Sequence, residues 1–416
     1  MTARADRLRF EEAVAEILAH SRPGGREIVL PIAESAGFVL AEEIVSDLDL
    51  PPFDRAAMDG FAFRHADLDG ACASRGFRIA GTVPAGEAAP RPVLAPGECV
   101  KIMTGASLPP GADTVIAVEE TSGYGNEGEQ VVFQRVPERG GNIAPRGQDL
   151  RAGAVMLRPG RLLQPAEIAL LATAGRHTVR VHAGPTIAFS ATGEELREPG
   201  EALPPGCIRN SNAYNLWSQI LIARARPRYL GILRDRPDEL RRAIASGLAE
   251  DFLILSGGVS MGEFDLVPGI LEELGVELRF RKLFVRPGQP TVFGVRRAGE
   301  HTTLVFGLPG NPVSTLLSFD QYVAPAVRVF RHHPQPLATL YRGTLLESVR
   351  KREGFRTLVP CISRWNDDRF ELTPLRLHGS ADLAAASGMD AIGFAPEPGT
   401  ETPAGTVIGF RKLHEP

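Results

Sequence analysis

The chain has 416 residues, of which 43% are hydrophobic and 23% charged, a balance typical of soluble globular proteins. One hydrophobic core rarely supports this length, so several domains are expected. The net charge of −4 and the lack of a polybasic run argue against a nucleic-acid partner, and the lack of a long apolar stretch argues against a membrane span.

The N-terminus and the cysteines favour a cytoplasmic protein with reduced thiols. No apolar signal core follows Met1, which argues for the cytoplasm. Cys72, Cys99, Cys207 and Cys361 are far apart and form no Cys-x-x-Cys pair. Buried free thiols are therefore expected, rather than a disulfide framework or a zinc site.

Residues 1–52 and 141–180 predict an elongated N-terminal domain of helices and linkers. Apolar side chains recur there at helical spacing, and stretches rich in glycine and proline end the runs. The predicted helices cover residues 7–20, 32–46 and 165–174.

Residues 53–140 have short apolar runs separated by glycine and proline, which predicts an all-β module. Within it, Asp54 and Asp59 flank Ala-Ala-Met, and Gly60 permits an unusual backbone angle. A plain turn explains this segment as well as a binding loop does.

Residues 181–332 alternate between predicted strands and helices, the rhythm of a parallel sheet with helical crossovers. The strands are apolar runs without alternation, which suits strands buried on both faces. Residues 333–416 return to short strands with Pro and Gly turns and predict a small C-terminal β barrel or sandwich. In the α/β region the predicted strands are 186–190, 228–232, 252–256 and 303–306, and the predicted helices are 211–224, 236–248, 265–274 and 312–330.

Three predicted strands run directly into a Gly-rich or acidic loop and then a helix. The segments are 186–196, 252–265 and 303–314. Loops after the carboxyl ends of parallel strands converge on one crevice, where ligands bind. The chain therefore predicts a ligand site suited to phosphate and to polar, metal-linked recognition.

Two of these loops predict an anion cradle. In Gly307-Leu-Pro-Gly-Asn-Pro-Val-Ser314, Pro312 suits a first helical turn whose free amides attract anions. In Ser256-Gly-Gly-Val-Ser-Met-Gly262, paired glycines let backbone amides approach a ligand. A simple turn between a strand and a helix explains the first loop as well as an anion-binding site does.

Acidic residues follow several of the strands. Asp265 follows the Ser256 loop, and the segments 192–196 and 233–236 add Glu195 and Asp235. Carboxylates beside an anion cradle make sense where they hold Mg²⁺ or accept hydrogen bonds from a ligand's N–H groups. Helix capping explains Asp265 and Asp235 equally well.

Lys282 and Arg286 lie four residues apart before a Pro-Gly turn. Such cations can hold phosphate or another oxyanion. The alternative interpretation is a surface hairpin, in which these two cations would bind no ligand.

Together these segments resemble the molybdopterin molybdotransferase family, which includes the E domain of gephyrin. The resemblance covers essentially the whole chain. It rests on Phe53-Asp-Arg-Ala-Ala-Met-Asp-Gly60, Ile102-Met-Thr-Gly-Ala106, Arg146-Gly-Gln-Asp149, Thr192-Gly-Glu-Glu-Leu196, Ser256-Gly-Gly-Val-Ser260 with Asp265, and Gly307-Leu-Pro-Gly-Asn-Pro-Val-Ser314.

The resemblance implies insertion of molybdenum from molybdate into adenylylated molybdopterin, with release of AMP and a requirement for Mg²⁺. It also implies a cytoplasmic homodimer in which the α/β crevice faces the β module of the other subunit. Further partners implied are molybdopterin adenylyltransferase and molybdoenzyme clients. The catalytic residues implied are Asp59, Glu195, Asp235, Asp265 and Lys282, with Asp265 and Glu195 as metal ligands. The substrate-binding residues implied are Thr104, Asp149, Thr192, Gly193, Ser256, Gly257, Gly258, Ser260, Arg286, Pro309, Gly310, Asn311 and Ser314.

The chain departs from the family pattern at several positions. Arg286-Pro-Gly-Gln289 replaces Lys-Pro-Gly-Lys, so one cation is changed and one is lost. The other departures are Ala56, Phe61, Asn210 and Arg236. Two alternatives follow: a catalytically reduced paralogue that binds or carries molybdenum cofactor, and a molybdopterin adenylyltransferase, against which the extra β modules argue.

Overall fold

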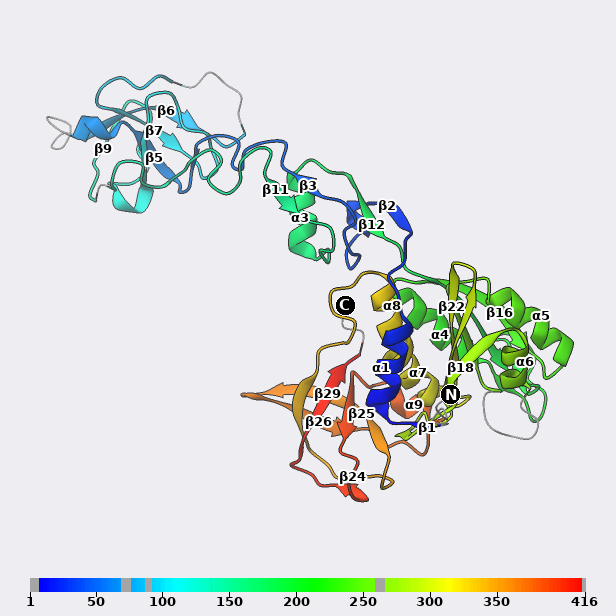
Figure 1. Cartoon of the computed structure of the whole chain (residues 1–416). Helices are drawn as coiled ribbons and strands as arrows, with labels where there is room; N and C mark the ends of the chain where they lie inside the picture. The colour runs from blue at the N-terminus through cyan, green and yellow to red at the C-terminus, as the bar shows by residue number, and fades with distance from the viewer. Residues whose placement is uncertain (1–6, 69–75, 87–91, 136, 259–265, 414–416) are drawn as a thin grey trace. The chain divides into compact units, whose positions relative to one another are not determined.

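The computed structural model describes residues 7–68, 76–86, 92–135, 137–258 and 266–413 (Figure 1). No helix within these ranges is long and apolar enough to cross a membrane. The described chain divides into two compact units. The first comprises Met1–Glu42, Pro159–Ile168 and His177–Pro416, and the second comprises Glu43–Arg158 and Ala169–Arg176.

The first unit is built around a six-stranded sheet of order β16-β13-β17-β22-β21-β18. The four strands from β16 to β22 are parallel, as the sequence predicts, and β21 and β18 extend the sheet antiparallel. The mixed character arises because a two-residue turn at Gly299, with φ +63°, folds β21 directly back onto β22. The strands are β13 Thr186–Thr192, β16 Arg226–Leu233, β17 Phe252–Ser256, β18 Val276–Phe280, β21 Val292–Ala298 and β22 His301–Leu308.

Helices cover both faces of this sheet, which explains the continuous apolar runs of its strands. In β17, Phe252 and Ile254 face the core shared with α1, α4 and α7, whereas Leu253 and Leu255 face the core shared with α5 and α6. The helices are α1 Phe10–His20, α4 Ser211–Ile222, α5 Pro237–Gly247, α6 Val267–Glu273, α7 Pro312–Ser318 and α8 Ala324–Phe330.

The single helix predicted over residues 312–330 is interrupted. A π-helical turn, η4 Phe319–Val323, separates α7 from α8. Pro325 lies in the first turn of α8 and lacks the N–H that an uninterrupted α-helix would use there, which favours the break.

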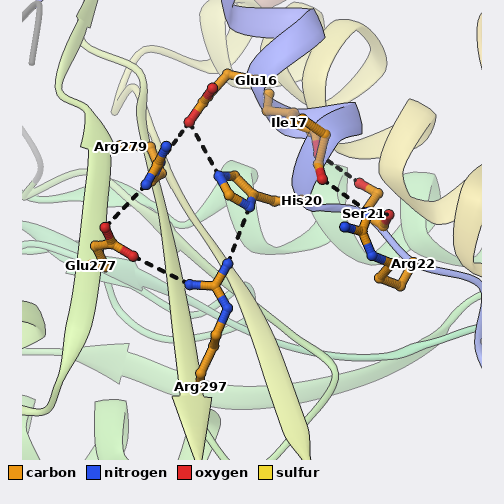
Figure 2. Close-up of polar contacts among 9 residues, drawn as sticks. Glu16, Ile17, His20, Ser21, Arg22, Glu277, Arg279 and Arg297 are labelled. Carbon is orange, nitrogen blue, oxygen red and sulfur yellow. Dashed lines mark hydrogen bonds and ion pairs between the residues drawn. The ribbon is translucent and has the colours of Figure 1, made fainter.

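Helix α1 is fastened to the sheet by a polar network (Figure 2). Glu16 accepts from Arg279 at 2.5 Å and contacts His20 Nε2 at 3.2 Å. Arg297 lies 3.3 Å from His20 Nδ1, and Glu277 bridges the two arginines. Because a guanidinium can only donate, His20 Nδ1 is the acceptor and Nε2 carries the proton that faces Glu16.

The C-terminal region forms a closed five-stranded barrel, as the sequence predicts. The order β25-β26-β23-β29-β27 closes because β25 also pairs with β27. Inward side chains such as Leu345, Leu372 and Phe410 fill it. Its strands are β23 Tyr341–Leu345, β25 Arg356–Asn366, β26 Arg369–Pro374, β27 Ala391–Ala395 and β29 Val407–Lys412, and the short helix α9 Leu383–Ala386 lies between β26 and β27.

The helix predicted over residues 32–46 is wrong. The only helical element that forms in this range is a 3-10 turn, η1 Ile32–Glu34, and Gly37, with a φ of +79°, breaks any continuation of it. Leu40 then donates its amide to Arg161 O, so this apolar stretch is buried as extended chain. The long-range backbone pairing therefore outweighs the helical preference that the spacing of apolar residues indicates. The predicted helix at 165–174 is confirmed as α3 Pro165–Thr173, and the predicted helix at 7–20 is shortened to α1.

The second unit carries the predicted β-rich module. Its sheet has the order β8-β5-β7-β6-β9, and on one side Phe133 stacks with the buried Phe77 and packs at an angle against the buried Phe63. The strands are β5 Gly60–Phe63, β6 Phe77–Val83, β7 Glu98–Ile102, β8 Thr114–Ala117 and β9 Gln130–Val131, with the shorter pairs β4 Arg55–Ala56 and β10 Ile143–Ala144, and β3 Ile44–Val45 and β11 Val155–Leu157.

The cysteines within the described residues are free thiols. Burial raises the pKa of Cys99 and of Cys361 to about 12, so both stay protonated and unreactive. Cys207 is only half-buried, because it lies in the loop before α4, and Cys72 lies outside the described residues.

Candidate functional site

A cavity of about 590 Å³ lies at the carboxyl ends of β13, β17 and β22, where the sequence predicts a crevice. Its lining includes Thr192 and Glu195 after β13, Ser256, Gly257 and Gly258 after β17, and Pro309, Gly310 and Asn311 after β22. A second cavity of about 540 Å³ shares its Pro290 and Pro309–Asn311 wall and adds Arg286, Gln289, Ser314 and Ser380. Because the two cavities lie on either side of this shared wall, they are described together as the candidate site.

The glycine pair after β17 is required by close packing. Gly257 and Gly258 have φ of +82° and +60°. A Cβ on Gly257 would lie 2.9 Å from Thr192 O, and one on Gly258 would lie 2.5 Å from Thr192 Oγ1. Only glycine fits there, and its bare backbone lines the cavity.

The floor of the first cavity holds a fixed hydrogen-bond acceptor that the sequence-based site residues did not include. Asn212, in α4, donates its Nδ2 protons to Ser256 Oγ at 2.9 Å and to Gly310 O at 2.8 Å. This orients the amide, and its buried Oδ1 has no partner among the described residues. The buried Thr192 Oγ1 is likewise unpaired. The floor therefore suits a ligand that brings N–H or O–H donors.

The wall after β13 is acidic and held rigidly by Arg234. This guanidinium donates to Gly193 O at 3.0 Å and to Glu194 O at 2.8 Å. Burial, and then repulsion by Glu194 and Glu195, raise the pKa of Asp235. Carboxylates that repel one another favour a bound cation. Within the described ranges, no group of three His, Cys, Asp or Glu side chains forms a complete metal site.

The second cavity presents cationic and hydroxyl groups. Arg286 lines it and leans on the Phe355 ring at 5.4 Å, while Asn311 Nδ2 donates to Ser380 Oγ at 2.6 Å. Ser380 comes from the segment before α9, so the C-terminal region supplies part of the wall. Lys282 instead lies in the short strand β19 Lys282–Leu283, paired with β1 Arg7–Leu8, and is not among the lining residues.

Asp59, Thr104 and Asp149 belong to the second unit. Asp59 accepts hydrogen bonds from Thr104 N at 2.6 Å and Thr104 Oγ1 at 2.8 Å, which lower its pKa and keep it anionic. Gly60 is fixed next to it, since a Cβ there would lie 1.9 Å from Ile116 O. Asp149 lies in a separate turn, where its amide donates to Leu50 O at 2.9 Å.

Many of the predicted site residues are thus brought together, and others are not. Gly193 lies in the loop that Arg234 holds, and Asp235 lies close enough to Glu195 to be repelled by it, but neither residue lines the first cavity. Lys282 is also absent from its lining. Ser260 and Asp265 lie outside the described residues. Asn212 and Ser380 were missed. The segment Asn210-Ser-Asn212 is the one sequence feature that could have indicated Asn212 as a ligand-binding residue. The same segment is also typical of a helix cap, and Asn210 does cap α4.

Comparison with known proteins gives matches along most of the chain. A family model described as the MoeA N-terminal region (domain I and II) matches residues 8–175, and one described as a probable molybdopterin binding domain matches residues 188–329.

Curated relatives and solved structures agree with these matches. A molybdopterin molybdenumtransferase of Bacillus subtilis is 34% identical over 392 residues, which is 93% of this chain and 89% of the relative. One of Staphylococcus epidermidis is 31% identical over 89% of this chain and 87% of the relative. A molybdopterin biosynthesis moeA protein of Pyrococcus horikoshii has a TM-score of 0.76 at 28% identity, covering 99% of this chain and 100% of that one.

Proposed function

The chain belongs to the molybdopterin molybdenumtransferase family, and from this premise we propose that it inserts molybdenum from molybdate into adenylylated molybdopterin, with release of AMP. We further propose that it acts in the cytoplasm as a homodimer. The observation that carries the catalytic proposal is the paired cavity at the strand ends, whose floor offers fixed acceptors and whose second lobe offers a cation.

The first cavity suits the pterin end of such a substrate. A pterin presents N–H donors, and the unpaired Asn212 Oδ1 and Thr192 Oγ1 are matched acceptors. The bare backbone at Gly257 and Gly258 lets a flat or phosphorylated group approach closely. These groups position the substrate, and positioning is a large part of catalysis in a group exchange of this kind.

The second cavity suits an oxyanion. Arg286 supplies positive charge, and Ser314 and Asn311 supply donors for phosphate or molybdate. Gln289 lines the same cavity but carries no charge. This loss is the observation that favours the second candidate function, a catalytically reduced protein that binds or carries molybdenum cofactor.

Mg²⁺ fits the carboxylates of this site. Glu195 and Asp235 are hard oxygen donors, and burial, followed by the negative charges of Glu194 and Glu195, raises the pKa of Asp235. We propose that Glu195 and Asp265 hold the ion and that Asp235 supports it. When bound, Mg²⁺ supplies positive charge next to the phosphate groups.

Release of AMP tests the proposal. Purified protein receives adenylylated molybdopterin, molybdate and Mg²⁺, and AMP and active cofactor are measured. We expect AMP release that needs molybdate and stops with a chelator, and a Glu195→Gln variant that fails at saturating molybdate. Tight cofactor binding without AMP release would instead establish the carrier.

A further inference from the structure

A third cavity, of about 470 Å³, lies at the other end of α4 and shares no lining residue with the candidate site. The candidate site meets α4 at Ser211 and Asn212, whereas this cavity meets it from Gln219 to Ile222 and continues along η4 and α8. A 12-residue helix spans about 18 Å, so the two places are well separated.

Positive charge predominates around this cavity. Among the described residues that line it, Arg224, Arg328, Arg331 and Lys412 are cationic and Asp320 is acidic. Several guanidiniums around a concave surface focus a positive potential within it. These four cations outnumber the single carboxylate of Asp320, so the lining of the cavity carries a net positive charge.

Arg331 is held in place by backbone carbonyls. It is 5% exposed, and it donates through Nη1 to Ala223 O at 3.1 Å and through Nη2 to Gly37 O. Its Nε has no hydrogen-bond partner among the described residues. Burial, and then repulsion by Arg224 and Arg328, lower its pKa to about 10. An anion in the cavity would relieve this repulsion.

Phe38 fixes a pair of these guanidiniums. Arg224 lies 5.6 Å and Arg331 5.4 Å from the centre of its ring. Both guanidiniums are therefore positioned against the same aromatic ring. Arg331 also meets the carbonyl end of α4, so the negative end of that helix is capped and does not cancel the remaining charge.

An apolar side completes the cavity. Leu221 and Ile222 are each 51% exposed, and Ala223, Phe319 and Ala324 continue the surface. A ligand that fits would place a charged group against the arginines and a less polar part against these side chains.

We propose that this cavity is a binding site for a small phosphorylated molecule, whose phosphate is held by Arg224 and Arg328 and attracted by the charge of the buried Arg331. A phosphate dianion matches forked guanidinium donors better than a single carboxylate does, and it neutralises more of the accumulated charge. Lys412, whose ammonium lies 4.8 Å from the Phe370 ring, adds charge from the side.

Calorimetric titration of the full chain with inorganic pyrophosphate tests the site. An Arg286→Gln background removes the cation of the candidate active site and weakens binding there, so that a further loss on changing Arg224 or Arg328 reports this cavity. We expect one binding event in that background, weakened about tenfold or more by Arg224→Gln or Arg328→Gln, the loss expected for one charge-assisted hydrogen bond. Arg242→Gln, which removes an exposed cation on α5, is the matched control and should change nothing.

Several outcomes would overturn the proposal. They are no pyrophosphate binding in the Arg286→Gln background, equal weakening by Arg242→Gln, and equally tight binding of citrate, which would remove the preference for phosphate. If a second copy of the chain covers the cavity, pyrophosphate will not bind and Arg224→Gln will instead change the sedimentation coefficient. Thermal unfolding with and without ligand shows that each variant is folded.

Discussion

Asp235 carries its charge beside two carboxylates that repel it. Its pKa is raised by burial and then by Glu194 and Glu195. A carboxyl with a raised pKa in the folded state adds stability at low pH, and that stability is lost as the pH rises through the folded-state pKa. At neutral pH the ionised side chain therefore destabilises the metal-free protein.

Replacing this carboxylate should separate stability from activity. We expect Asp235→Asn to raise the thermal unfolding midpoint at pH 7 and to lower AMP release on the order of 10²-fold, the usual loss when one preorganised electrostatic group is removed. Mg²⁺ should stabilise the wild type more than the variant. Asp368→Asn, at an exposed carboxylate in the turn between β25 and β26, is the control and should change neither quantity. A lower midpoint with full activity would show that Asp235 is structural.

The effect of the cation lost at position 289, where the family pattern has lysine, can be tested at the single side chain of Gln289. It lines the same cavity as Arg286 but is neutral. If the lost cation weakens oxyanion binding, Gln289→Lys should lower the molybdate concentration needed for half-maximal AMP release about tenfold, because a charged hydrogen bond contributes roughly 1.5–3 kcal/mol. An unchanged or higher requirement would remove the link between this substitution and function.

The loop after β17 and the helix α6 that follows it offer a matched pair of glycines. Gly258 has a φ of +60° and no room for a Cβ, whereas nothing lies within 4 Å of a Cβ on Gly269 in α6. Gly258→Ala should cost about 1–2 kcal/mol of stability and abolish substrate binding. Gly269→Ala should stabilise the helix by about 0.5–1 kcal/mol and leave activity intact. Thermal unfolding and AMP release measure both effects, and equal behaviour of the two variants would contradict this assignment.

The attachment of α1 to the sheet depends on a neutral His20. Burial, and then the charge of Arg279, lower the pKa of His20 below 6.5, against the opposing effect of Glu16 (Figure 2). With a lowered pKa, the network contributes fully above pH 6.5, and its contribution is lost as the pH falls through the folded-state value. Protonation would also place an N–H of His20 against Arg297.

A non-titrating side chain should remove this pH dependence. We expect the unfolding midpoint of the wild type to fall more steeply between pH 7 and pH 5 than that of His20→Gln. His177→Gln, at an exposed imidazole, is the control for the substitution itself. Parallel curves for wild type and His20→Gln would show that another group controls the acid response.

Local sequence patterns predict the strands and the loops after them, but they do not predict contacts between segments that are distant in the chain. The runs at 186–190 and 252–256 were found because a doubly covered strand has no polar alternation. The segment 37–40 has the apolar spacing of a helix but is extended, because its backbone pairs with residues near Arg161 that are distant in sequence. Ser380 reaches Asn311 across 69 positions, and no local pattern shows such a contact.

The proposed functional residues are distributed over both compact units of the chain. Asp59 and Thr104 belong to one, and the paired cavity belongs to the other. Asp59 is exposed and anionic, Met58 directly precedes it and is also exposed, and the exposed Phe53 lies six residues earlier. An exposed loop of this composition suits contact with another surface. The proposed homodimer would complete each site with the Asp59 loop of the other copy.

Subunit mixing tests this shared site. Asp59→Ala and Glu195→Ala are each expected to be inactive alone. In a mixed dimer, one site would combine an intact cavity with an intact Asp59 loop, and the other would carry both defects. Random re-pairing of equal amounts should therefore restore about a quarter of the wild-type AMP release. Glu195→Ala mixed with Asp235→Ala is the matched control. Both of its defects belong to the cavity, so every site stays defective and no activity should return. If verified subunit exchange restores nothing in the first pair, each copy carries a complete site and the shared-site proposal is wrong.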